Sequence, residues 1–272
     1  MAWTELWSTH PDDLANLKGQ SLRTRFVLPR LFEREAFTFA YTHDDRLLVG
    51  GIRLGDGEVA LEAPPALKAS QLLDRRELAL VALDGSVRVA SSAGDFMLGR
   101  HDVLYLPMGT RDIRVQGAGA LYVVSAPAHA GGKAAVARRD GVETVRLGSA
   151  EGANDRTIRK YIHADGIASN QLVLGITTLE PGSVWNTMPA HVHSRRTEVY
   201  LYDGLGDNVL VHLMGRPDET RHLVLHERDA IVSPPWSIHS GSATGAYSFV
   251  WAMAGENIDY NDVVPVNPED LR

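Results

Sequence analysis

Short runs of β-branched and aromatic residues, separated by turn residues, dominate this chain and predict an all-β fold. The predicted strands are 37–42, 46–54, 77–83, 87–90, 103–106, 121–125, 171–179, 198–202, 209–213, 222–225, 230–232 and 247–251. One short helix is expected near Pro11, because proline and the acidic residues after it suit a first helical turn. Helices should therefore contribute little to the fold.

Two stretches between the predicted strands have a distinct character. Asp84-Gly85 separates 77–83 from 87–90 and predicts a two-residue β-hairpin. Residues 128–135 are small and unpatterned, as expected of a linker or a long surface connection. We therefore expect two domains, 1–130 and 131–272.

The two halves resemble each other weakly. Residues 75–77 precede an apolar run as residues 195–198 do, at an offset of 120. Residues 102–107 parallel 229–234 at an offset of 127, and a longer hairpin in the second half would absorb the difference. The economical description is a tandem pair of similar barrels.

Composition narrows the classes of function. The net charge is −7 and no basic stripe is present, which argues against nucleic-acid binding. There is no cysteine, so disulfides and thiolate chemistry are excluded. The chain shows neither a signal-peptide pattern nor an apolar stretch of about 20 residues. We therefore expect a cytoplasmic protein that has no membrane partner.

Three histidines and one carboxylate predict a metal site. His191 and His193 stand two apart, so both side chains would project to one face of a strand. After a turn, Glu198 can enter the same cavity from the next strand, and His239 can reach it from a later one. Three neutral imidazoles and a carboxylate suit a divalent first-row metal: Zn²⁺, one per chain, with Mn²⁺, Fe²⁺ or Ni²⁺ as alternatives.

The remaining polar positions do not form a second metal site. No nearby carboxylate completes a pocket with His212, His222 or His226, so exposed or hydrogen-bonded roles are expected for them. In the first half, the positions that correspond to three of the ligands hold other residues: Gln71, Leu73 and Asp112. Only the second domain is expected to bind metal.

Several segments, in order along nearly the whole chain, carry a family resemblance. They are 9–13, 41–46, 75–78, 125–129, 179–189, 219–222 and 236–241, together with the ligand segment. The chain resembles the 5-keto-4-deoxyuronate isomerases, also called 4-deoxy-L-threo-5-hexosulose-uronate ketol-isomerases, a bicupin family of pectin breakdown. The resemblance implies two cupin (jelly-roll) barrels, a homo-oligomer, hexameric, and zinc on the same four residues.

The resemblance also implies a reaction. It is the interconversion of 5-dehydro-4-deoxy-D-glucuronate and 3-deoxy-D-glycero-2,5-hexodiulosonate, so the expected partner is a small sugar acid. An enediol path needs a base beside a carbonyl and an electrophile such as the metal; a hydride shift is the alternative. Tyr200, Tyr202 and Glu256 are the candidate catalytic residues.

Substrate-binding candidates come from two places. Arg159 and His163 would share one face of a short strand, where Arg159 could hold the substrate carboxylate. Lys160 would then point the other way. Trp236 stands two residues after Pro234, where the generic cupin motif has glycine, and is expected to narrow the pocket beside His239.

Three other functions remain open from the sequence. The first is the sister reaction, isomerisation of 5-deoxy-glucuronate in inositol catabolism. The second is an iron-dependent cupin dioxygenase that uses the same four ligands, and the third is a non-catalytic sugar-sensing or structural cupin.

Overall fold

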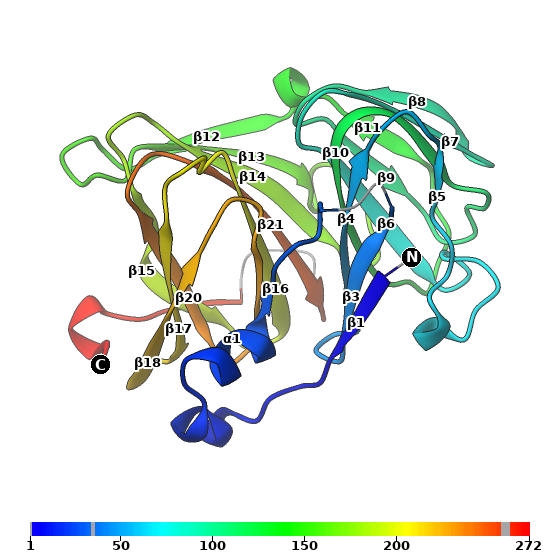
Figure 1. Ribbon diagram of the computed structural model, residues 1–272. Helices are drawn as coiled ribbons and strands as arrows, with labels where there is room; N and C mark the ends of the chain where they lie inside the picture. Colours follow the sequence, from blue (N-terminus) through cyan, green and yellow to red (C-terminus); the bar gives the residue numbers. More distant parts are fainter. Residues whose placement is uncertain (1, 34–35, 257–261) are drawn as a thin grey trace. The chain divides into compact units, whose positions relative to one another are not determined.

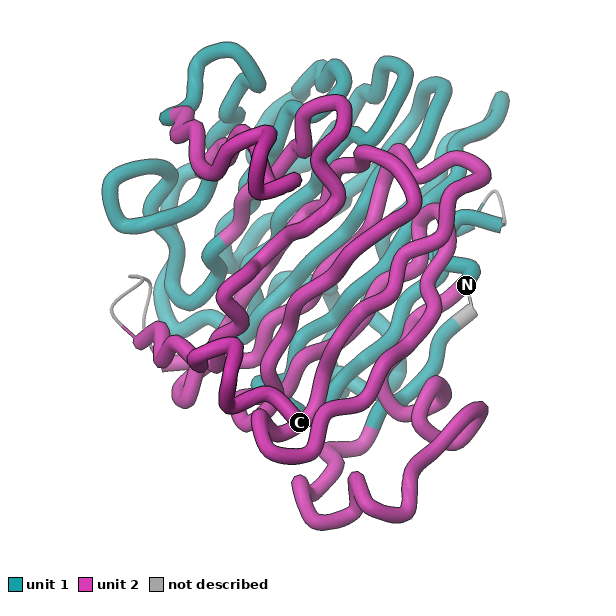
Figure 2. The backbone as a smooth tube through the Cα atoms, turned by 90° about the vertical axis from the view of Figure 1, so that its left-hand side faces the viewer, with its two compact units in different colours: residues 1–6, 30–143, 161–173 teal, residues 7–29, 144–160, 174–272 magenta. Residues whose placement is uncertain are grey.

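The computed structural model describes residues 2–33, 36–256 and 262–272, and strands dominate its secondary structure (Figure 1). Contacts divide the chain into two compact units (Figure 2). Unit 1 contains residues 1–6, 30–143 and 161–173, and unit 2 contains residues 7–29, 144–160 and 174–272. Neither unit is one continuous stretch, and the division into domains 1–130 and 131–272 stays a prediction.

Unit 1 is built on a ten-stranded sheet. Its main path runs β1 (Ala2–Leu6), β3 (Thr38–Thr42), β4 (Leu48–Leu54), β10 (Arg114–Pro127), β6 (Arg76–Ala82), β9 (Val103–Leu106) and β11 (Ala135–Ala137). Off this path lie β5 (Val59–Ala60), β7 (Ser86–Ser91) and β8 (Gly94–Leu98). Its core is apolar, with Leu78, Leu80 and Val123 fully buried.

Unit 2 is built on two sheets. The seven-stranded sheet runs β12 (Glu143–Leu147), β13 (Arg156–Ile162), β14 (Val173–Leu179), β21 (Ser248–Gly255), β16 (Arg196–Asp203), β19 (Ala230–Ser233) and β2 (Val27–Leu28). The five-stranded sheet runs β18 (Glu219–Leu225), β17 (Leu210–Arg216), β20 (Ile238–Ala243), β15 (Trp185–His193) and β22 (Val263–Pro265). Buried polar residues, including Glu198, His212 and His239, lie in this unit.

The strand order repeats between the two units. The run β3-β4-β10-β6-β9 corresponds to β13-β14-β21-β16-β19. In the first run Leu78 pairs with Leu106, and in the second Glu198 pairs with Ser233. These partners differ by the offsets of 120 and 127 that the sequence indicates, so Leu78 occupies the place of Glu198.

The predicted hairpin at Asp84-Gly85 is wrong. β6 and β7 do not pair with each other; both pair with β10, β6 along residues 121–127 and β7 along 114–118. The chain therefore bends and continues along the same neighbour. Gly85 has a φ of 68°, and an added Cβ would lie 1.9 Å from the Ala118 carbonyl oxygen. Glycine is thus required by a close approach to β10 rather than by a hairpin turn.

Helices are few and short. The helix expected near Pro11 is a 3₁₀ helix, η1 (Pro11–Asn16), whose first turn is capped by the His10 side chain. The helix α1 (Gln20–Phe26) was not predicted. The other 3₁₀ helices of the described residues are η2 (Pro65–Leu67), η3 (Arg139–Gly141) and η4 (Pro268–Asp270). Of the helices described, none has the length and apolar character needed to cross a bilayer.

One buried carboxylate organises a loop of unit 1. Glu77 is fully buried and accepts hydrogen bonds from the backbone N–H groups of Asn170, Gln171 and Leu172 at 2.6, 2.7 and 2.8 Å. The hydroxyl of Tyr105 also donates to it, at 2.8 Å. Because buried backbone donors must be satisfied, Glu77 fixes the path of residues 170–172.

Candidate metal centre and its cavity

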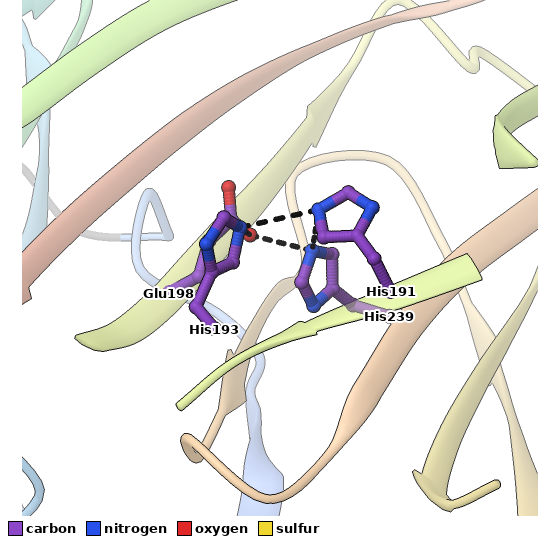
Figure 3. A group of neighbouring side chains, drawn as sticks. All are labelled: His191, His193, Glu198 and His239. Carbon is purple, nitrogen blue, oxygen red and sulfur yellow. Dashed lines mark hydrogen bonds and ion pairs between the residues drawn. The ribbon is translucent and has the colours of Figure 1, made fainter. Parts of the chain in front are cut away.

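The structure brings the four expected ligands together inside unit 2 (Figure 3). His191 and His193 come from β15 and His239 from β20, all in the five-stranded sheet, while Glu198 comes from β16 in the facing seven-stranded sheet. The Nε2 atom of His191 lies 3.1 Å from Nε2 of His193 and 3.1 Å from Nε2 of His239. One ligand atom from each of the four residues lies within 4.8 Å of all the others.

The donor set fits a divalent cation. His193, Glu198 and His239 are each at most 3% exposed, and Oε2 of Glu198 lies 2.7 Å from Nε2 of His239. Within the described part of the chain this oxygen is buried yet accepts no hydrogen bond of normal geometry. Converging nitrogen and oxygen donors in a buried site are the arrangement a cation such as Zn²⁺ needs.

Electrostatics favour the ligand-competent protonation states of His191 and Glu198. Burial, reinforced by the neighbouring His239, lowers the pKa of His191 to about 3. Burial would raise the pKa of Glu198, but the adjacent imidazoles outweigh it and the pKa falls well below its usual range. A neutral imidazole and an ionised carboxylate are the forms that bind metal. Burial also opposes a charge on His193, yet Glu198 beside it holds the pKa of His193 above its ordinary value.

A residue outside the predicted set supports His193. Nδ1 of His193 lies 3.3 Å from Oδ1 of Asp262, and the guanidinium of Arg196 donates to both oxygens of that carboxylate. With Nδ1–H donating to Asp262, Nε2 of His193 is left as the atom that faces the cluster. Asp262 follows Glu198 by 64 residues and belongs to no recognisable motif, so the sequence offered no signal for it.

The cluster borders a cavity of about 430 Å³ within unit 2. His191, His193 and Glu198 line it, together with side chains from β13, β14, β21 and β22. The register between β15 and β20 shifts between Asn186 and His191, and residues 187–189 of this irregular stretch also line the cavity. Such irregularities re-aim side chains beside functional sites.

The predicted catalytic residues occupy different environments. Tyr200 lines the cavity, its hydroxyl lies 3.1 Å from Oγ1 of Thr187, and burial raises its pKa well above the ordinary value. Tyr202 does not line the cavity; its hydroxyl is hydrogen-bonded to Nδ1 of His212 at 2.7 Å. The side chain of Glu256 is 68% exposed and lies 3.9 Å from Arg195. Only Tyr200 is placed where it can meet a ligand of the cavity.

The predicted substrate-binding residues also lie elsewhere. Alternate residues of β13, Arg156, Ile158 and Lys160, line the cavity, so Arg159 is on the opposite face. The expected orientation of this strand is therefore reversed, because its first five residues are all half-buried and four of them are polar, so they give no alternation to read. His163 belongs to unit 1, where Nε2 lies 3.9 Å from Glu143.

Trp236 is not part of the cavity lining. Its indole N–H donates to the Thr9 carbonyl oxygen at 3.2 Å, and its ring makes an edge contact with Phe26. Trp236 therefore holds residues of the N-terminal segment of unit 2 in place, and it does not narrow the pocket beside His239.

Comparison with known families gives this arrangement a context. The sequence model of the KduI/IolB family matches residues 35–266 of this chain. The chain belongs to the KduI/IolB family. Among curated members, a protein named 4-deoxy-L-threo-5-hexosulose-uronate ketol-isomerase from Cereibacter sphaeroides is 47% identical over 264 residues, which cover 96% of each chain. A protein of the same name from Agrobacterium fabrum is 42% identical and covers 97% of each chain. The family resemblance of the sequence is thereby confirmed.

Solved structures with low sequence identity share the KduI/IolB chain's fold. An IolB-like protein from Salmonella typhimurium aligns with a TM-score of 0.66 at 18% identity and covers 81% of this chain and 86% of its own. An oxalate decarboxylase of Bacillus subtilis aligns with a TM-score of 0.55 at 14% identity and covers 81% of this chain and 71% of its own. Together with the dominance of strands, these similarities confirm the predicted all-β bicupin fold.

Proposed function

We propose that this member of the KduI/IolB family is a metal-dependent ketol-isomerase that interconverts 5-dehydro-4-deoxy-D-glucuronate and 3-deoxy-D-glycero-2,5-hexodiulosonate. The names of relatives at 41–47% identity over nearly the full length support the reaction. The observation that carries it is the convergence of His191, His193, Glu198 and His239 beside a cavity that the first three of them line. The sister 5-deoxy-glucuronate isomerase is the nearest alternative, and the relatives' names favour the first reaction.

The reaction requires a hydrogen to move from C2 to C1, in the numbering of 5-dehydro-4-deoxy-D-glucuronate. The C2 carbon and its hydroxyl each lose a proton, and C1 and its oxygen each gain one. A bound divalent cation would polarise the carbonyl and offset the negative charge that develops as the C2 proton leaves. The protein's own contribution includes Tyr200, whose raised pKa keeps the hydroxyl protonated and suits it to donate a hydrogen bond to a substrate oxygen.

The proposal extends to the setting of the reaction. We take Zn²⁺ as the cation, since three imidazoles and one carboxylate suit it. The family resemblance supports a hexameric homo-oligomer. It also supports a location in the cytoplasm, where the enzyme acts on small sugar acids released from pectin. Gel filtration with light scattering checks the hexamer, and metal analysis of protein purified without added metal checks zinc.

An isomerase assay tests the function. Wild-type protein loaded with Zn²⁺, the same protein stripped by a chelator, and the His239→Ala variant are each given freshly prepared 5-dehydro-4-deoxy-D-glucuronate. Turnover should vanish on stripping, return with Zn²⁺ and be absent from the variant. His222→Ala, at an exposed position of β18, is the control and should retain activity. Absence of turnover by fully loaded wild-type protein rejects the assignment, and 5-deoxy-glucuronate is then the next substrate to assay.

A further inference from the structure

Two cationic side chains of β13 face the cavity. Arg156 and Lys160 line it together with Ile158, because alternate residues of a strand project to the same side. Arg159, between Ile158 and Lys160 in sequence, projects from the other face. The cavity therefore carries positive charge on the wall formed by β13.

Arg156 carries a charge that no carboxylate balances within the described residues. Its one hydrogen bond there joins Nη1 to the Asn154 carbonyl oxygen at 2.9 Å. Burial lowers its pKa from the ordinary value, and the nearby ionisable groups that act on it are the hydroxyls of Tyr200 and Tyr247. Other partly buried arginines of unit 2 are paired: Arg23 with Asp229 at 2.7 Å and Arg228 with Asp203 at 3.1 Å. A half-buried guanidinium whose remaining N–H groups have no acceptor in the described part of the chain is suited to bind an anionic group of a ligand.

The rest of the cavity fits the remainder of a small sugar acid. The histidine–glutamate cluster lines it from β15 and β16 and offers a place for carbonyl and hydroxyl oxygens. Apolar side chains, including Ile158, Phe249, Trp251 and Met253, also line it. Such surface suits the methylene carbon of a deoxy sugar, because it has no hydroxyl to satisfy. One cavity thus combines a metal-ligand wall, an apolar surface and a cationic wall.

We propose that Arg156 and Lys160 bind the carboxylate of the substrate and so restrict the enzyme to sugar acids. Arg156 holds the carboxylate through two guanidinium N–H groups, and Lys160 adds a second positive charge. The opposite end of the substrate, which carries the C1 aldehyde and the C2 hydroxyl, is thereby directed to the cluster of His191, His193 and Glu198. The identity of the substrate in this inference rests on the proposed function, whereas binding of a carboxylate does not.

Substitutions along one strand test the role of each side chain. Arg156→Gln and Lys160→Gln remove one charge each from the cavity, and Arg159→Gln removes one from the opposite face of the same strand. Loss of a charged hydrogen bond corresponds to a roughly 10- to 100-fold fall in kcat/KM, which should come mainly from KM. Arg159→Gln should stay within about 2-fold of wild type. Equal losses in Arg156→Gln and Arg159→Gln would show a general charge effect and overturn the assignment.

Ligand binding gives a readout that does not depend on turnover. Isothermal titration of Zn²⁺-loaded wild-type protein compares D-glucuronate with neutral D-glucose, and the same pair is titrated into Arg156→Gln. The proposal expects wild type to prefer D-glucuronate and the variant to lose that preference while its circular dichroism spectrum stays unchanged. No preference in wild type, or an undiminished preference in the variant, overturns it. Protein that prefers D-glucuronate through Arg156 but fails to isomerise 5-dehydro-4-deoxy-D-glucuronate keeps the carboxylate site and loses the proposed function.

Discussion

Arg196 and Asp262 form an ion pair whose two side chains are completely shielded from solvent. Nε of Arg196 donates to Oδ2 of Asp262 at 2.8 Å, and the other carboxylate oxygen lies 3.3 Å from Nδ1 of His193. A buried carboxylate held by arginine is a fixed acceptor, so it determines both the tautomer and the orientation of the imidazole. The ion pair therefore links the backbone of β16 to the geometry of a proposed metal ligand.

This link predicts that Asp262→Asn weakens metal binding. The amide carries no charge and orients Nδ1–H of His193 less strongly, so we expect Zn²⁺ affinity to fall by about 10- to 100-fold. Competition with a chromogenic chelator measures that affinity. Asp218→Asn, an exposed carboxylate 3.2 Å from Arg216, is the matched control. Unaltered Zn²⁺ affinity in a folded Asp262→Asn protein would contradict the positioning role.

The enediol path predicts exchange with solvent. When the reaction is run in D₂O, a proton removed from C2 can be replaced by deuterium before it is delivered to C1. We therefore expect deuterium at the hydroxymethyl carbon of the product, which was C1 of the substrate, detected by mass spectrometry or NMR. A product that contains no deuterium at carbon would favour the hydride shift instead. The native lining of the cavity is retained in this experiment, so it separates the two paths without any substitution.

His212 predicts a dependence of stability on pH. Burial, followed by the influence of His239, lowers the pKa of His212 to about 3. The unfolded chain binds a proton at about pH 6.5, so the folded state loses stability as the pH falls below that value and continues to do so down to about 3. The loss is about 1.4 kcal/mol per pH unit, or about 2 kcal/mol between pH 6.5 and pH 5.

Chemical denaturation of His212→Gln at pH 7 and pH 5 measures this contribution. The variant should show a smaller fall in the free energy of unfolding than wild type, by about 2 kcal/mol. His226→Gln, whose imidazole is exposed, should retain the fall seen in wild type. An identical fall in His212→Gln and wild type would show that the buried imidazole does not contribute.

Close packing behind the cavity predicts that Gly175→Ala is destabilising. An added Cβ would lie 2.0 Å from Cζ2 of Trp251, a ring that lines the cavity and whose N–H donates to Oγ1 of Thr177 at 3.1 Å. The ring has to move, and such overpacking costs about 1 to 3 kcal/mol. Thermal unfolding and near-ultraviolet circular dichroism report the two effects. Gly57→Ala, where an added Cβ meets no atom within 4 Å, should leave both unchanged.

The cluster of possible ligands was accessible from the sequence because it depends on local rules. His191 and His193 share a strand face through the two-residue period, and the cupin spacing of the family resemblance supplies Glu198 and His239. The repeat was accessible for a similar reason, since the offsets between 75–77 and 195–198 and between 102–107 and 229–234 survive as identical pairing registers.

The features that the sequence did not predict correctly depend on contacts between distant parts of the chain. The side of β13 that faces the cavity cannot be read from its first five residues, because four of them are polar and all are half-buried, so Arg159 was expected in place of Arg156 and Lys160. Asp262 reaches His193 only through folding of the chain. The pair Asp84-Gly85 has the composition of a hairpin turn, but pairing of both flanking strands with β10 decides its conformation.

Each compact unit is made of three separate segments of the chain, and this limits which fragments of the protein can fold. A fragment that starts at residue 131 would lack Val27 and Leu28, which pair with Ile231 and Ala230, and would leave that sheet edge open to aggregation. The complementary fragment would keep Glu77 and the Tyr105 hydroxyl that donates to it but lose the three backbone donors of residues 170–172, leaving the buried carboxylate with too few partners. Neither fragment expressed alone is expected to keep the fold that it has in the whole protein. Binding and catalysis therefore have to be studied by substitutions in the full chain.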